Sequence, residues 1–308
     1  MNINEETREN QSDDIDLIGL LKVFWDYKLS IIIILTLFSI LSVFYSLSLP
    51  NKYQSSALLT VISESNQQSA LNQFGGIAGI AGIAIPQESN KAQVGIEVLK
   101  SRSFIEDFIE RRGIKDLLMA STGWDRETNK IIFDDELFLQ SKSEWVKEDG
   151  ITIEPSIHKT YDFWMKEIFT YEEDLKTGFI TVRLEYFSPY LAKEWLDLLM
   201  HDLNNFMRDR DVREAELSIE YLNNEVSGTK SEALKDVFYN LIKTNTEKKM
   251  LAFSREDYLF RIIDPPIAPE EKSSPNRPLI CILGFLLGLM FSFIYVLFMN
   301  YIFRNSEK

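Results

Sequence analysis

Cysteine and histidine are scarce in this chain of 308 residues, which has one cysteine and two histidines. One thiol cannot form a disulfide within the chain, and so few soft ligands exclude thiolate zinc sites and iron–sulfur clusters. Basic residues are outnumbered, because 33 Lys and Arg face 47 Asp and Glu and leave a net charge of −14. A chain this acidic repels phosphate backbones, so nucleic acid is excluded as a general partner.

Catalytic motifs are also missing from the sequence. There is no GxSxG nucleophile elbow, and the segment that starts at Gly228 (GTKS) lacks the upstream glycine of a phosphate-binding loop. His158 and His201 stand far apart without a metal-like spacing, and spacing selects no glycosidase-like pair among the carboxylates. We therefore expect no enzyme activity, no catalytic residue, no cofactor and no bound metal.

Two long runs without charge dominate what is present. Leu29–Leu49 and Leu279–Met299 are 21 residues each, and helices of that length span roughly 30 Å, the thickness of bilayer hydrocarbon. Both are predicted to be transmembrane helices, 29–49 and 279–299. The acidic stretch of 28 residues before the first run is unlike the short basic start of a secretory signal, so this run is expected to remain as an anchor.

Charge next to the runs predicts the orientation. Lys22 and Lys28 precede the first run, which favours an N-terminus inside the cell. Residues 1–28 and 300–308 are then cytoplasmic tails, and residues 50–278 form one exported domain. Nine residues follow the second run, so we expect no cytoplasmic output module such as a kinase.

The sequence of the exported domain predicts a mixture of strands and helices. Tyr53–Ile62, Phe179–Tyr186 and Tyr258–Ile263 have strand patterns, and the first and last of them are expected to pair. A helix is predicted from a capping box at Ser103 and Glu106 to a left-handed stop at Gly113. Its apolar stripe consists of Phe104, Ile105, Phe108 and Ile109. Residues 123–171 give no clear pattern.

A long helix follows the middle strand. Ser188 is the expected N-cap and Pro189 the first helical residue, and the helix should end at Gly228. A capping box at Thr229 and Glu232 predicts a second helix to about residue 253. The fold class is therefore an α+β membrane protein, in which two transmembrane helices flank a periplasmic α/β base domain with a long projecting helical hairpin, about 189–253.

Prolines and glycines mark the candidate interaction residues. A proline-rich segment, 264–278, should be extended and stiff; its prolines are Pro265, Pro266, Pro269, Pro275 and Pro278. Gly284 and Gly288 form a GxxxG motif in the second run, which permits close helix–helix approach. Gly76, Gly79 and Gly82 recur in a glycine-rich segment, which is either a flexible loop or an apolar segment that meets a partner or a lipid surface.

Several of these segments together resemble Wzz-type chain-length determinants, also called polysaccharide co-polymerases. The segments are DLIGLLKVFWDYK before the first run, KYQSSALLTV after it, GGIAGIAGIAI, VLKSRSFIEDFI, and the stretch KKMLAFSREDYLFRIIDPPIAPEEKSSPNRPLICILGFLLG. The resemblance implies a kinase-free member in the bacterial inner membrane. It further implies a ring-like homo-oligomer that sets the chain length of O-antigen (lipopolysaccharide) or a related surface polysaccharide made by a separate Wzy-type polymerase.

The hypothesis that follows is a non-catalytic oligomeric scaffold that touches lipid-linked glycan weakly or transiently. The alternative is a two-span accessory subunit of a transporter or channel, although such subunits usually carry polar residues inside their spans. A membrane-tethered hydrolase is the third reading, for which the sequence offers no constellation. Trp124, Trp145 and Trp164 could stack on sugars, but core positions are the favoured interpretation.

Overall fold

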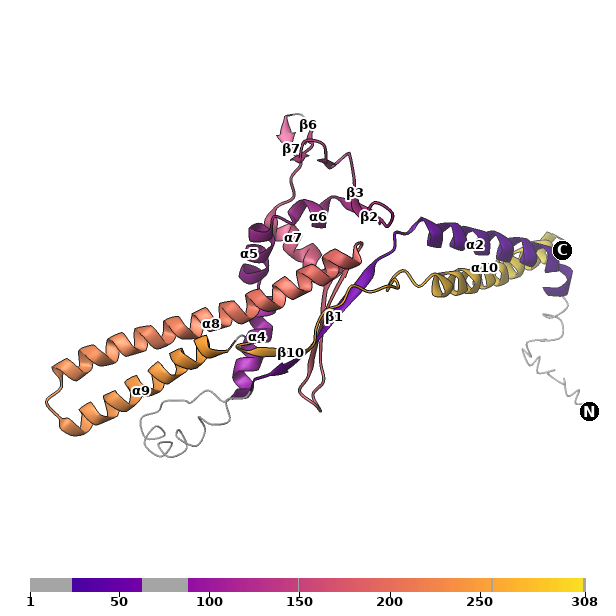
Figure 1. The fold of residues 1–308 in the computed structure, drawn as a ribbon. Helices are drawn as coiled ribbons and strands as arrows, with labels where there is room; N and C mark the ends of the chain where they lie inside the picture. The colour runs from indigo at the N-terminus through magenta and orange to yellow at the C-terminus, as the bar shows by residue number, and fades with distance from the viewer. Residues whose placement is uncertain (1–23, 63–87, 149, 256, 307–308) are drawn as a thin grey trace, which may run out of the picture. The chain divides into compact units, whose positions relative to one another are not determined.

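The computed structural model describes residues 24–62, 88–148, 150–255 and 257–306. The chain divides into two compact units, one made of Met1–Leu49 with Pro275–Lys308 and the other of Pro50–Ser274. The protein is a mixed helix and sheet structure with two candidate membrane helices (Figure 1). Gly76, Gly79 and Gly82 lie outside the described residues.

The first unit is a pair of apolar helices, α2 (Lys28–Ser48) and α10 (Arg277–Ser306). By length and composition, Lys28–Ser48 and Arg277–Ile302 could each cross a membrane. They contain the two charge-free runs, except that α2 ends one residue before the predicted limit. The two helices pack against each other, and the rings of Phe38 and Phe291 stack at 5.3 Å between centroids.

The second unit is built on an antiparallel sheet with strand order β10-β1-β9-β8. These strands are β1 (Tyr53–Val61), β8 (Phe169–Glu173), β9 (Ile180–Tyr186) and β10 (Phe260–Asp264). The predicted pairing of the first and last strands is confirmed, because Leu59 lies opposite Ile262. The central pair is longer and runs from Tyr53 opposite Tyr186 to Leu59 opposite Ile180.

Buried and half-buried side chains alternate along β9, and this alternation shows which face of the sheet is buried. Val182, Leu184 and Tyr186 are at most 1% exposed, whereas Arg183 and Glu185 between them are half-buried. The start of α8 covers this face, where Leu196 and Leu199 are fully buried. This period-two pattern places the main core between the sheet and the helices.

Short helices complete the core of the second unit. They are α4 (Glu88–Lys100), α5 (Arg102–Arg112), α6 (Lys115–Met119), α7 (Ile157–Phe163) and the π-helical turn η1 (Trp164–Ile168). The predicted stripe of α5 is buried, and Gly113 ends the helix with φ 61° as predicted. The predicted capping box is wrong, because the N-cap is Ser101, whose hydroxyl accepts from the Phe104 amide.

The region that gave no clear pattern contains three small hairpins. They pair β2 (Ser121–Asp125) with β3 (Lys130–Phe133), β4 (Phe138–Leu139) with β5 (Glu144–Trp145), and β6 (Lys147–Glu148) with β7 (Ile151–Thr152). Four of these strands have only two residues. Strands this short carry too little alternation to be read from sequence.

Two long helices, α8 (Pro189–Gly228) and α9 (Glu232–Ser254), lie side by side in Figure 1. The predicted start of α8 is confirmed, because Ser188 accepts from the Leu191 amide and Pro189 is the first helical residue. The capping box predicted for α9 is wrong: Thr229 caps the C-terminal end of α8, and Ser231 precedes α9 without a side-chain capping bond.

Candidate interaction sites

The glycine motif of α10 lies against α2 of the same chain. A Cβ atom added to Gly284 would overlap the side chain of Ser42, and one added to Gly288 would come within 2.8 Å of the Phe38 Cβ. Both glycines therefore occupy positions where a larger residue would force the helices apart. Ser46, Ser292 and Val296 are at most 1% exposed, so the pair shares a packed seam.

The proline-rich segment runs beside the start of β1 within the second unit. The Lys52 amide donates to the Ser274 carbonyl at 2.9 Å, and the Ser273 amide donates to the Lys52 carbonyl at 2.9 Å. The Ser55 hydroxyl donates to the Ile267 carbonyl at 2.9 Å. These bonds fasten the segment to the sheet, which fits its predicted extended backbone.

The individual prolines are placed differently from one another. Pro266 is buried, Pro269 and Pro275 are half-buried, and Pro265 is exposed. Pro278 does not belong to the extended segment, because α10 already begins at Arg277. Proline is tolerated in the first helical turn, where no intrahelical donor is needed, so the predicted limit of 278 is too long.

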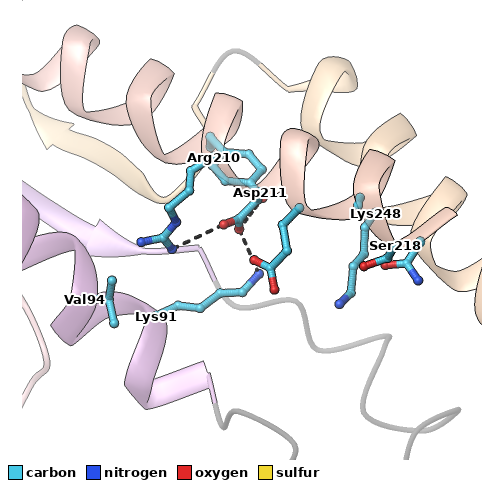
Figure 2. A pocket seen from close by; sticks show the side chains of 10 residues that line it. Lys91, Val94, Arg210, Asp211, Ser218 and Lys248 are labelled. Atoms are coloured by element: carbon cyan, nitrogen blue, oxygen red, sulfur yellow. Dashed lines mark hydrogen bonds and ion pairs between the residues drawn. The ribbon is translucent and has the colours of Figure 1, made fainter. Parts of the chain in front are cut away.

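A cavity of about 330 Å³ lies where α4, α8 and α9 meet the chain leading into β10. One of its lining groups is Asp211, which accepts from the Tyr258 hydroxyl at 2.8 Å. Figure 2 shows Lys91 and Arg210 directed toward the same carboxylate, at 3.5 Å and 3.3 Å. The remaining polar lining comes from Glu214, Ser218, Asn245 and Lys248.

Both acidic and basic side chains line this cavity, but they do not form a catalytic arrangement. Asp211 is engaged by three neighbours, and the lining residues include no cysteine or histidine. The contacts of Asp211 join α4, α8 and the chain before β10. We therefore interpret it as a junction that holds the base of α8.

A second charged junction lies on the other side of α8. Asp202 is 8% exposed, and its carboxylate accepts two bonds from Arg112, at 2.8 Å and 2.9 Å. Arg111 adds a third contact at 3.4 Å. The neighbouring Asp107, which bonds Arg111 at 2.7 Å, is the main cause of the raised pKa of that guanidinium. The cluster fixes α5 to α8, so its role is structural.

The tryptophans and histidines singled out in the sequence differ in their burial. Trp164 is fully buried against Phe108 and Trp195, as the core interpretation predicts. Trp124 and Trp145 are only half-buried. His158 bonds Glu106 through Nδ1 at 2.6 Å, and His201 is exposed on α8.

No cluster of three or more potential metal ligands exists among the described residues. Sequence reasoning missed the Asp202 and Asp211 junctions, because each of them joins residues that are far apart along the chain.

Two family models match the chain. Residues 13–111 match Wzz, described as "Chain length determinant protein", and residues 230–301 match GNVR, described as "G-rich domain on putative tyrosine kinase". The predicted resemblance to Wzz-type chain-length determinants is thus confirmed. The tyrosine-protein kinase etk of Escherichia coli K12 is 28% identical over 135 residues, which are 42% of this chain and 18% of that protein. The chain therefore spans less than a fifth of the curated relatives it matches.

Two solved structures are similar to the chain over much of its length. A full-length bacterial polysaccharide co-polymerase is 17% identical, with a TM-score of 0.41, over 95% of this chain and all of the other. A fragment of WzzB, a polysaccharide co-polymerase from Salmonella Typhimurium, is 12% identical, with a TM-score of 0.30, over 73% of this chain and all of the fragment.

Proposed function

We propose that this protein regulates the chain length of O-antigen or a related surface polysaccharide, as a non-catalytic oligomeric scaffold. The observation that carries the proposal is the match of residues 13–111 to the chain length determinant model. The two candidate membrane helices, which flank the second unit in the sequence, support it. The polymer itself would be made by a separate Wzy-type polymerase.

In this proposal the protein lies in the bacterial inner membrane, with both termini cytoplasmic and the second unit in the periplasm. Copies associate into a ring, and the α8–α9 pair projects from the base as an arm. The exposed apolar side chains of that pair support association through it. Examples are Leu217, Tyr221, Tyr239 and Met250, each more than half exposed.

The role we assign to Gly284 and Gly288 is to hold α2 and α10 together within one copy. Both glycines face α2, so the polymerase would meet the outer faces of the span pair instead. Glycan contact is weak and transient in this account, because an acidic surface does not hold a phosphate-bearing lipid carrier tightly.

The direct test is a deletion strain analysed on a glycan ladder gel. Loss of the protein should replace a modal length distribution by a broad one, and the gene supplied in trans should restore the mode. A ladder unchanged by the deletion would refute the function. Survival of the ladder together with a transport defect would instead support a two-span transporter subunit.

Oligomerisation needs a separate measurement. Mass photometry of the full chain in detergent should find a closed assembly of several copies, because the scaffold acts through copy number. A monomer at working concentration would refute the scaffold without refuting a role in chain length.

A further inference from the structure

Three aromatic side chains from distant parts of the sequence gather at one end of the second unit. The ring of Trp124 in β2 lies 5.6 Å from that of Tyr53 in β1 and 6.2 Å from that of Tyr190 in α8, between centroids. Tyr190 is 55% exposed, and the other two are half-buried. We call Tyr53, Trp124 and Tyr190 the aromatic cluster.

The β2–β3 hairpin holds Trp124 in a fixed position. Its indole N–H donates to the Asn129 Oδ1 at 3.0 Å, across the turn of the hairpin. Asp125 accepts from the Thr128 hydroxyl at 2.6 Å and from the Glu127 amide at 3.0 Å. These bonds also lower the pKa of the Asp125 carboxyl. A ring fixed in this way loses little conformational entropy when it binds a surface.

The cluster is tied closely along the chain to both candidate membrane helices. Tyr53 follows the last residue of α2, Ser48, by five residues, which reach roughly 18 Å at most when extended. On the other side, Ser274 pairs with Lys52 and precedes the start of α10, Arg277, by three residues. Both connections between this end of the unit and the candidate membrane helices are therefore short along the chain, and within the second unit they are bonded to each other.

The chemistry of the cluster matches the boundary between lipid and water. Tyr and Trp have an apolar ring and a polar tip, and they are enriched where membrane proteins cross the headgroup region. The same hairpin carries Ile132, which is 49% exposed. The headgroup layer is roughly 5–7 Å thick on each side of the hydrocarbon, so the connections are long enough for the rings to lie in it.

We infer that the aromatic cluster and the β2–β3 hairpin contact the lipid headgroup region and anchor the second unit on the membrane surface. The inference requires that α2 and α10 span the bilayer, and it is independent of the role in chain length. Such an anchor, added to the two covalent connections, would fix the tilt of the unit relative to the bilayer. It would therefore set the direction in which α8 leaves the membrane surface.

The test places a nitroxide at the tip of the hairpin in the full chain. Lys130→Cys is made in a Cys281→Ser background, because Cys281 is the only thiol in the sequence. The matched control is Lys176→Cys, which is also exposed and lies in the turn between β8 and β9. That turn is at the opposite end of the sheet, because Ile180 pairs next to it whereas Tyr53 pairs with Tyr186.

The labelled proteins are reconstituted in vesicles of phosphatidylethanolamine and phosphatidylglycerol. Collision rates with oxygen and with a water-soluble nickel chelate are then compared. The label at position 130 should show a higher oxygen rate and a lower nickel rate than the label at 176, with the ratio changed severalfold. Equal rates at both positions would overturn the inference. A fall in both rates at position 130 would also overturn it, since a second copy or a bound glycan would then cover the hairpin.

Discussion

The base of the second unit and its long helical pair are stabilised in different ways. In the base, the buried set runs through the sheet, α5 and the first half of α8 and forms one continuous core. Beyond Met207, α8 buries only Val212, Ala215 and Leu222, and α9 buries only Ala252 among its described side chains. The base has a core of its own, whereas the far half of the pair shows an apolar surface that a single copy leaves uncovered.

The polar contacts of the base and of the far half of the helical pair also differ. The base of α8 is fastened by Asp202 to α5 and by Asp211 to α4 and the chain before β10. Farther out, the ion pair between Glu216 and Lys249 joins α8 to α9, with both side chains substantially exposed. Exposed ion pairs contribute little to stability, so the far half of the pair should be the least stable part of the described unit.

Removing a core side chain should have the largest effect on stability. Trp164→Ala deletes a ring that is 0% exposed and should lower the free energy of unfolding by about 3–5 kcal/mol. The contrasting variant in the helical pair is Lys243→Ala, whose side chain is 73% exposed and lies 3.9 Å from Glu247 in α9, and it should cost less than about 0.5 kcal/mol. Denaturant unfolding of the full chain in detergent, followed by circular dichroism, measures both. Equal losses would contradict the contrast between base and arm.

The contact of Gly284 and Gly288 with α2, which we call the glycine seam, allows the same kind of comparison within the membrane helices. Gly284→Leu forces bulk against Ser42, and such overpacking costs about 1–3 kcal/mol. We expect the variant to shift the modal glycan length on a ladder gel while the second unit stays folded. Leu283→Ile keeps the side-chain volume of the same helix at a position that is 52% exposed, and it serves as the control. A wild-type ladder for Gly284→Leu would remove the seam from the mechanism.

A smaller effect is expected from the buried phenol of the base. The Tyr186 hydroxyl donates to the Leu117 carbonyl at 2.6 Å and lies 2.9 Å from the Ser121 hydroxyl. Tyr186→Phe should cost about 1 kcal/mol at neutral pH, the usual net value of one hydrogen bond.

Burial also makes that contribution depend on pH. It raises the pKa of Tyr186 well above its ordinary value, so the folded state favours the neutral phenol. The resulting stability is complete below the unfolded pKa of about 10 and is lost as pH rises above it. The fall in unfolding free energy above that pH should be shallower in Tyr186→Phe than in the wild type. Parallel curves would contradict this assignment.

Local signals in the sequence predicted much of the fold. Ser188 before Pro189 marked the start of α8, Gly113 marked the end of α5, and the alternation in β9 marked the central strand. Both capping boxes were wrong for a shared reason: Ser101 and Ser231 lie near the predicted caps, and the spacing of three residues fits more than one start.

The interaction residues were harder to predict, because sequence motifs do not name their partners. The spacing of Gly284 and Gly288 indicated a close approach, but only the structure shows that α2 of the same chain lies there. The aromatic cluster joins residues 53, 124 and 190, and no periodic pattern links positions so distant. The proline segment was predicted as extended, and its bonds to Lys52 and Ser55 depend on the sheet.

The most direct test of the central claim is the glycan ladder of a strain whose arm is shortened at its tip. Replacing Asn223–Ser231 by a short glycine–serine turn removes the exposed junction of α8 and α9 and leaves the core of the base intact. The account predicts a shorter modal length at unchanged stability of the base. A wild-type ladder from this variant, at normal protein level, would contradict it.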